Sequence, residues 1–127
     1  MNGTNIVFDT CAAILLLRGK YELSSLGIDI DEVIQYISVI TRIELMSKPD
    51  MKVEDERVIK NFVDDVIVSL LDEAVEHKTV EIRRVSKLKL LDCIIAATSI
   101  VLDAILLTDD DDLLKFSFPG FRAQNIL

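Results

Sequence analysis

The residues of this sequence that are best suited to chemistry are carboxylates. The 127-residue chain carries 22 Asp and Glu against 14 Lys and Arg, a formal net charge of -8, with one histidine and two cysteines. The histidine and the cysteines together are one ligand short of a closed tetrahedral zinc site, and a lone histidine excludes a two-histidine acid/base nuclease. Any bound metal should therefore be a hard cation such as Mg²⁺ or Mn²⁺.

Acidic residues follow or open the apolar segments of the chain. Asp9 comes directly after the apolar run 5–8, Glu44 follows the run 36–40, Asp92 opens a strongly apolar segment, and residues 109–112 are consecutive aspartates. The carboxyl ends of parallel strands meet at one edge of a sheet, so these groups should converge there. Crowded carboxylates either take up protons or bind a cation, and we expect a divalent metal at neutral pH.

Each of these acids also has a purely structural explanation. Asp9 could end a strand or cap a helix, and Glu44 could be the capping-box partner of Thr41. Asp92 could simply favour the positive end of its helix, and the run 109–112 could be a solvated turn. Taken together these explanations are weaker than the metal hypothesis, because four adjacent like charges repel one another.

The apolar periodicity predicts strands that alternate with helices. Strands are expected at 5–8, 36–40, 66–70 and 104–107, and helices at 10–17, from Thr41 onward, and at 53–66, 72–84 and 91–102. This alternation predicts an α/β fold, a three-layer α/β/α sandwich with a central, mainly parallel sheet of about four or five strands. The length fits a single domain, residues 1–127.

The sequence predicts a cytoplasmic protein without a membrane anchor. The longest uncharged apolar stretch, 93–102, is about half of the roughly 20 residues that span a bilayer. No basic residue precedes the first apolar segment, as one would in a secretory signal. Cys11 and Cys93 both lie in apolar contexts, so we expect reduced cysteines in the core.

Four segments together resemble PIN-domain ribonucleases, and most of all the VapC toxins of prokaryotic toxin–antitoxin pairs. They are NIVFDT (5–10), SVITRIEL (38–45), KLKLLDCIIAATSI (87–100) and AILLTDDDDLLKF (104–116). Their order and spacing match over essentially the whole chain. The most specific part is LDCIIAAT followed by the aspartate run, and the resemblance implies a PIN-like fold.

The resemblance also implies an acidic cluster that binds Mg²⁺ or Mn²⁺. Its members would be Asp9, Glu44, Asp92 and Asp110, with Asp112 as an additional ligand and with Thr10 and Thr108 orienting the carboxylates. Asp109 stands where the family more often has a neutral or basic residue, so the fourth ligand could be Asp109, Asp110 or Asp112. The number of metals, one or two, also stays open.

The activity implied by the resemblance is hydrolysis of an RNA phosphodiester by a metal-activated water. The implied partners are the RNA substrate, a VapB-type antitoxin that covers the site, and a second copy of the chain in a homodimer. Residues 12–17 and 53–66 are the candidate walls of an antitoxin groove.

An acidic protein that cleaves RNA still has to hold phosphates. The segment 77–89 contains five Lys and Arg against one Glu and leads directly to Asp92. The candidate phosphate contacts are Arg83, Arg84, Lys87 and Lys89. The same residues could instead be a basic helix end that complements the helix dipole.

Two other classes of function compete with the nuclease. A phosphoacceptor receiver domain is also acidic, α/β and of similar length, but no Asp here follows a middle strand in the required manner. A catalytically degenerate PIN-like scaffold would bind protein or RNA without cleaving it, and the presence of all four acids argues against it.

Overall fold

The computed structural model describes residues 4–127, and its centre is one sheet of five parallel strands. The strands are β1 (Thr4–Phe8), β2 (Val33–Ser38), β3 (Ile67–Ser69), β4 (Ala104–Thr108) and β5 (Arg122–Asn125). They lie in the order β3-β2-β1-β4-β5. This is not the 2-1-3-4-5 order of flavodoxin-like folds, so the receiver-domain alternative is wrong.

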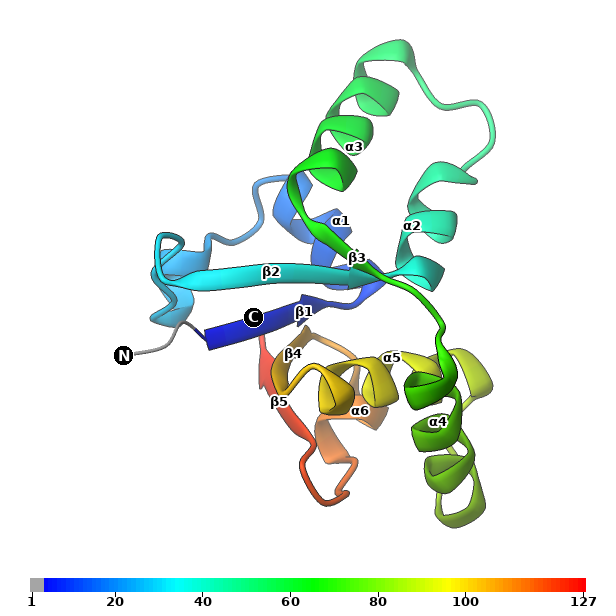
Figure 1. Ribbon diagram of the computed structural model, residues 1–127. Helices are drawn as coiled ribbons and strands as arrows, with labels where there is room; N and C mark the ends of the chain where they lie inside the picture. Colours follow the sequence, from blue (N-terminus) through cyan, green and yellow to red (C-terminus); the bar gives the residue numbers. More distant parts are fainter. Residues whose placement is uncertain (1–3) are drawn as a thin grey trace.

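Helices cover both faces of the sheet, which confirms the predicted three-layer α/β/α fold (Figure 1). They are α1 (Thr10–Leu17), α2 (Val39–Met46), α3 (Val53–Asp65), α4 (Glu73–Val85), α5 (Leu90–Val101) and α6 (Asp111–Lys115), with a 3₁₀ turn η1 (Leu23–Leu26). Alternate side chains of β1 face opposite layers: Ile6 and Phe8 pack toward α1, α2 and α3, while Val7 packs toward α4, α5 and α6. None of the helices in residues 4–127 is long and apolar enough to cross a membrane.

Helix α2 begins two residues earlier than predicted. Ser38 is its N-cap, with the hydroxyl oxygen accepting a hydrogen bond from the Ile40 N–H at 3.1 Å. Thr41 is therefore a buried residue inside the helix, and the predicted capping box with Glu44 is wrong. The β-branched pair Val39 and Ile40 suggests a strand, but the serine cap before it starts a helix. Glu44 consequently lies near the end of α2 and not in its first turn.

The C-terminal region contains two elements that the sequence did not predict. Helix α6 starts inside the aspartate run, where the Asp110 carboxylate accepts hydrogen bonds from the N–H groups of Asp112 at 2.8 Å and Leu113 at 3.3 Å. The run is thus a helix cap and first turn and not a free solvated turn. Strand β5 then pairs with β4 and completes the sheet.

Candidate active site

Asp9 lies at the carboxyl end of β1 and is only 7% exposed. One carboxylate oxygen, Oδ1, accepts a hydrogen bond from the Ala12 N–H at 2.7 Å and so caps α1. The other oxygen, Oδ2, accepts a hydrogen bond from the Thr108 hydroxyl at the end of β4. The capping explanation for Asp9 is therefore correct, but the second bond ties the same carboxylate to a strand that lies 99 residues further along the chain.

Thr108 joins the ends of two strands. It is fully buried, and its hydroxyl donates to Asp9 while accepting a hydrogen bond from the Asp110 N–H at 3.0 Å. Because β1 and β4 are neighbours in the sheet, this single hydroxyl holds Asp9 and the start of the aspartate run together. The hydroxyl of Thr10 has a comparable role for Glu44, since it donates to the Glu44 Oε1 at 2.5 Å.

The charges of neighbouring acids act on Asp9. The pKa of Asp9 is raised from 3.8 to about 6, mainly by burial, with smaller contributions from the charges of Asp109 and Asp110. Hydrogen bonds from Thr108 and Ala12 oppose this rise. The two acidic neighbours thus add to the free energy needed to ionise Asp9.

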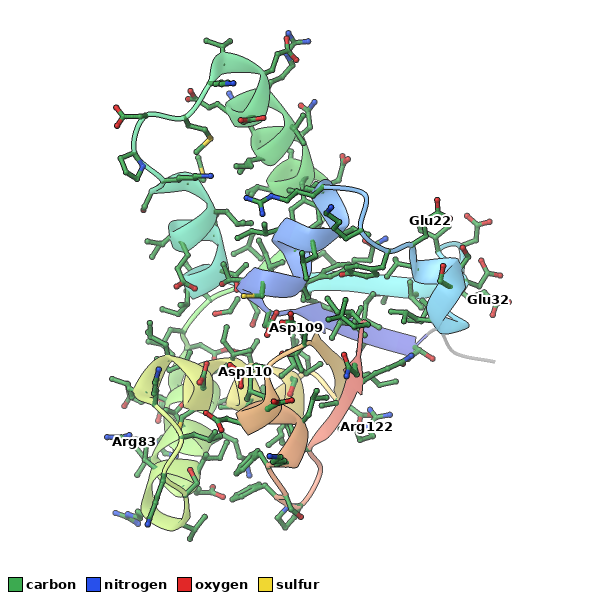
Figure 2. All side chains as sticks on the ribbon, turned by 180° about the vertical axis from the view of Figure 1, so that it is seen from behind. Glu22, Glu32, Arg83, Asp109, Asp110 and Arg122 are labelled. Carbon is green, nitrogen blue, oxygen red and sulfur yellow. The ribbon has the colours of Figure 1, made fainter. Side chains whose placement is uncertain are left out.

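The pKa of Asp92 is raised as well. Burial is the largest cause, the charges of Asp110, Asp112 and Glu44 add to it, and the Lys89 ammonium opposes it. The charge of Asp110 thus raises the pKa of both Asp9 and Asp92, which favours Asp110 within the aspartate run as the fourth acid of the cluster. Figure 2 shows Asp109 and Asp110 between α1 and the helices α5 and α6.

Residues 4–127 contain no three His, Cys, Asp or Glu side chains that are already arranged to hold a metal ion. The acids bond instead to donors of the chain itself: Asp9 to Ala12 and Thr108, and Glu44 to Thr10. The donor set nevertheless fits a hard divalent cation, because it consists of carboxylate oxygens; burial and the charges of neighbouring acids raise the pKa values of two of them, Asp9 and Asp92.

The two cysteines differ in their surroundings. Cys93 is buried, as predicted, whereas Cys11 is exposed on the first turn of α1, so the prediction of a core position was wrong for Cys11. Partial burial and the charges of Asp9, Asp109, Asp110 and Glu44 raise the pKa of the Cys11 thiol. Cys11 therefore borders the acidic cluster, a position that its apolar sequence neighbours concealed.

The four candidate phosphate contacts lie around the corner between α4 and α5. The Arg83 guanidinium donates to the Leu88 carbonyl at 2.9 Å, so this residue stabilises the corner itself. In Figure 2 it projects away from Asp110. The side chains of Arg84, Lys87 and Lys89 are exposed. Of the four, Lys89 is the one whose charge lowers the pKa of Asp92.

The fold of this chain is similar to folds found in solved toxin–antitoxin structures. The chain is similar to VapBC2 from Rickettsia felis bound to a DNA fragment from its promoter, with a TM-score of 0.80 and 17% identity over 96% of this chain and 98% of the other. It is also similar to a toxin–antitoxin complex from Klebsiella pneumoniae, with a TM-score of 0.72 and 26% identity over 91% and 93%. A third similar structure is DNA-bound VapBC from Salmonella typhimurium, with a TM-score of 0.74 and 21% identity over 98% and 99%.

Sequence comparison with curated proteins gives no significant match. The family model of the PIN domain, in contrast, matches residues 6–119. This range includes Asp9, Glu44, Asp92 and the whole aspartate run. The chain belongs to the PIN-domain family.

Proposed function

We propose that the protein is a metal-dependent endoribonuclease and the toxin of a VapBC-type pair. The observation that carries the proposal is the connection at the carboxyl edge of the sheet, where buried Asp9 is linked through Thr108 to Asp110. Asp92 and Glu44 come from two further helices, and their charges act on the same group of acids. PIN domains are generally nucleases, and this arrangement supplies the acidic residues that such chemistry needs.

In this proposal Asp9, Asp92 and Asp110 hold Mg²⁺ or Mn²⁺, and Asp112 is an additional ligand. When bound, the cation supplies an activated water and offsets negative charge on the phosphate. Glu44 either contributes a ligand oxygen or orients the attacking water, and Thr10 fixes its carboxylate. Thr108 keeps Asp9 ionised by donating to it.

The proposed substrate is an RNA strand whose phosphates contact the exposed basic residues near the start of α5. The charge of Lys89 acts on Asp92, and the exposed residues Arg84 and Lys87 add further positive charge. Arg83 contributes charge in addition to its bond with Leu88. Binding through these residues weakens as salt concentration rises, because phosphate contacts release counterions.

The proposed partner is a VapB-type antitoxin that occupies a groove between α1 and the α2–α3 pair. This groove has a volume of about 340 Å³, and Glu44 is one of its lining residues. Its apolar lining residues are Ile14, Leu17, Leu45, Met51, Val58 and Ile59. These apolar residues, together with charged lining residues such as Arg18, Lys48 and Asp55, suit an amphipathic protein segment, and a segment bound there would lie against Glu44 of the candidate active site. We place this pair in the cytoplasm.

The protein is also proposed to form a homodimer, and the exposed apolar residues near β3 are the candidate interface. Ile43 and Met46 on α2, Ile67 on β3, and Leu70 and Leu71 after it are each more than two-fifths exposed. We expect light scattering at micromolar concentration to give twice the 14.3 kDa mass of one chain. The variant Leu70→Asp should shift the protein to monomer, and a monomeric parent protein would contradict the proposal.

Cleavage of RNA by the purified chain tests the proposed activity. We expect cleavage with Mg²⁺ or Mn²⁺ and none in EDTA, with a calorimetric signal when Mn²⁺ is added to the metal-free protein. The alternative, a PIN-like scaffold that binds without cleaving, is favoured by the lack of a preformed metal-binding group in residues 4–127. Absence of both cleavage and Mn²⁺ binding would support the scaffold and contradict the nuclease.

A further inference from the structure

Tyr21 is a buried residue that contacts the turn holding Asp9. It follows α1, and the chain reverses just before it at Gly19, whose φ of 70° lies in the left-handed region. This reversal returns Tyr21 to the side of α1, where the ring packs in the core and is 8% exposed. Its hydroxyl donates a hydrogen bond to the Ala12 carbonyl at 2.7 Å.

The peptide groups on both sides of Ala12 are bonded to Asp9. The Ala12 N–H donates to the Asp9 side chain at 2.7 Å, and the next N–H, that of Ala13, donates to the Asp9 backbone carbonyl at 3.0 Å. The peptide unit between Ala12 and Ala13 is therefore held at its N–H by Asp9 and at its carbonyl by Tyr21. The Ala12 N–H that bonds the Asp9 carboxylate lies in the preceding peptide unit, so Tyr21 fixes the residue whose two adjoining peptide units both bond to Asp9.

The charges of the acidic cluster also act on the Tyr21 hydroxyl. Burial is the main cause that raises the pKa of Tyr21, and the charges of Asp9 and Asp109 raise it further. The hydroxyl therefore stays protonated at neutral pH and acts as a donor to Ala12. The sequence offers no sign of this link, because Tyr21 lies outside all the segments that carry the acids.

We propose that Tyr21 is a positioning residue for the candidate metal centre, which fixes the first turn of α1 and thereby the orientation of the Asp9 carboxylate. The inference rests on the proposed function, since it concerns how well Asp9 serves as a ligand. Groups that orient a metal ligand commonly change metal affinity by about 10-fold or more when removed. Tyr21 acts through one intervening peptide turn, so we expect an effect of about 3-fold to 10-fold.

The test compares Tyr21→Phe with Tyr36→Phe, since these are the two tyrosines of the chain. Tyr36 lies on β2, and its hydroxyl forms no hydrogen bond within the described residues 4–127. We expect Tyr21→Phe to weaken Mn²⁺ binding, measured by calorimetry, by about 3-fold to 10-fold, and to lower kcat while leaving the KM for RNA unchanged. Tyr36→Phe should leave all three quantities at the parent values.

A second variant, Tyr21→Leu, lacks both the hydroxyl and the ring. It should lose as much Mn²⁺ affinity as Tyr21→Phe, because the inference assigns the effect to the hydroxyl. A Tyr21→Phe protein that melts at a lower temperature but binds Mn²⁺ as tightly as the parent would overturn the inference, because Tyr21 would then be only structural. Failure of the parent protein to bind Mn²⁺ or cleave RNA would instead contradict the proposed function, so the two failures are distinguishable.

Discussion

Replacement of Asp9 by asparagine should lower RNA cleavage by at least about 100-fold while leaving the protein folded. The asparagine oxygen can still accept the hydrogen bond from the Ala12 N–H, so the cap of α1 is kept. The neutral amide lacks the charge and the second ligand oxygen that a hard cation prefers. The measurement is the cleavage rate with Mn²⁺ held in excess, since metal affinity and turnover should both fall.

The same variant should be more stable than the parent protein when no metal is present. The pKa of Asp9 in the folded protein is about 6 against its usual 3.8, so the folded state binds the proton more tightly than the unfolded state. The stability that this group contributes is then greatest below about pH 4 and declines as pH rises through 6. Ionised Asp9 therefore costs the fold roughly 2 to 3 kcal/mol at pH 7.

Urea unfolding in EDTA measures this cost. We expect the free energy of unfolding of Asp9→Asn to exceed that of the parent by more at pH 7 than at pH 4.5, because Asp9 is largely protonated at the lower value. Asp111→Asn is the matched control, since it removes the same charge from an exposed position of the aspartate run. If the free energy of unfolding depends on pH equally in the parent and in Asp9→Asn, ionised Asp9 does not destabilise the fold.

The order of strands and helices could be predicted because most elements carry a local signal. The apolar run before Asp9 and the strongly apolar segment after Asp92 are buried as expected, in β1 and α5. The strand β5 was missed because its residues, RAQN, have no apolar pattern, and only pairing with β4 makes them a strand. Its formation depends on a tertiary contact that local propensity cannot express.

The acidic residues of the candidate site could be predicted from their places beside apolar segments, but their connections could not. The start of α2 is set by the Ser38 cap, and this moves Glu44 to the end of the helix, where Thr10 can reach it. The bond between Thr108 and Asp9 joins residues from distant segments, so no local pattern contains it. The choice within the aspartate run likewise depends on which charge acts on both Asp9 and Asp92, a property of the assembled fold.

Thr108→Val should weaken Mn²⁺ binding at pH 6.5 by about 10-fold to 100-fold, since it removes the hydroxyl that donates to Asp9. That hydrogen bond lowers the pKa of Asp9, so its loss should raise the pKa further above about 6. A larger fraction of the Asp9 side chain would then be protonated at pH 6.5, and the proton would have to leave before the carboxylate binds a cation. At pH 8 this part of the defect should disappear.

Calorimetric titration of Mn²⁺ into the metal-free protein at both pH values checks this expectation. Thr108→Ser is the matched control: it keeps the hydroxyl that donates to Asp9 and accepts from the Asp110 N–H, so its Mn²⁺ affinity should stay close to that of the parent. If Thr108→Val binds Mn²⁺ like the parent at pH 6.5, the hydroxyl has no part in preparing Asp9. A loss that is equally large at pH 6.5 and pH 8 would mean that Thr108 orients the carboxylate without keeping it ionised.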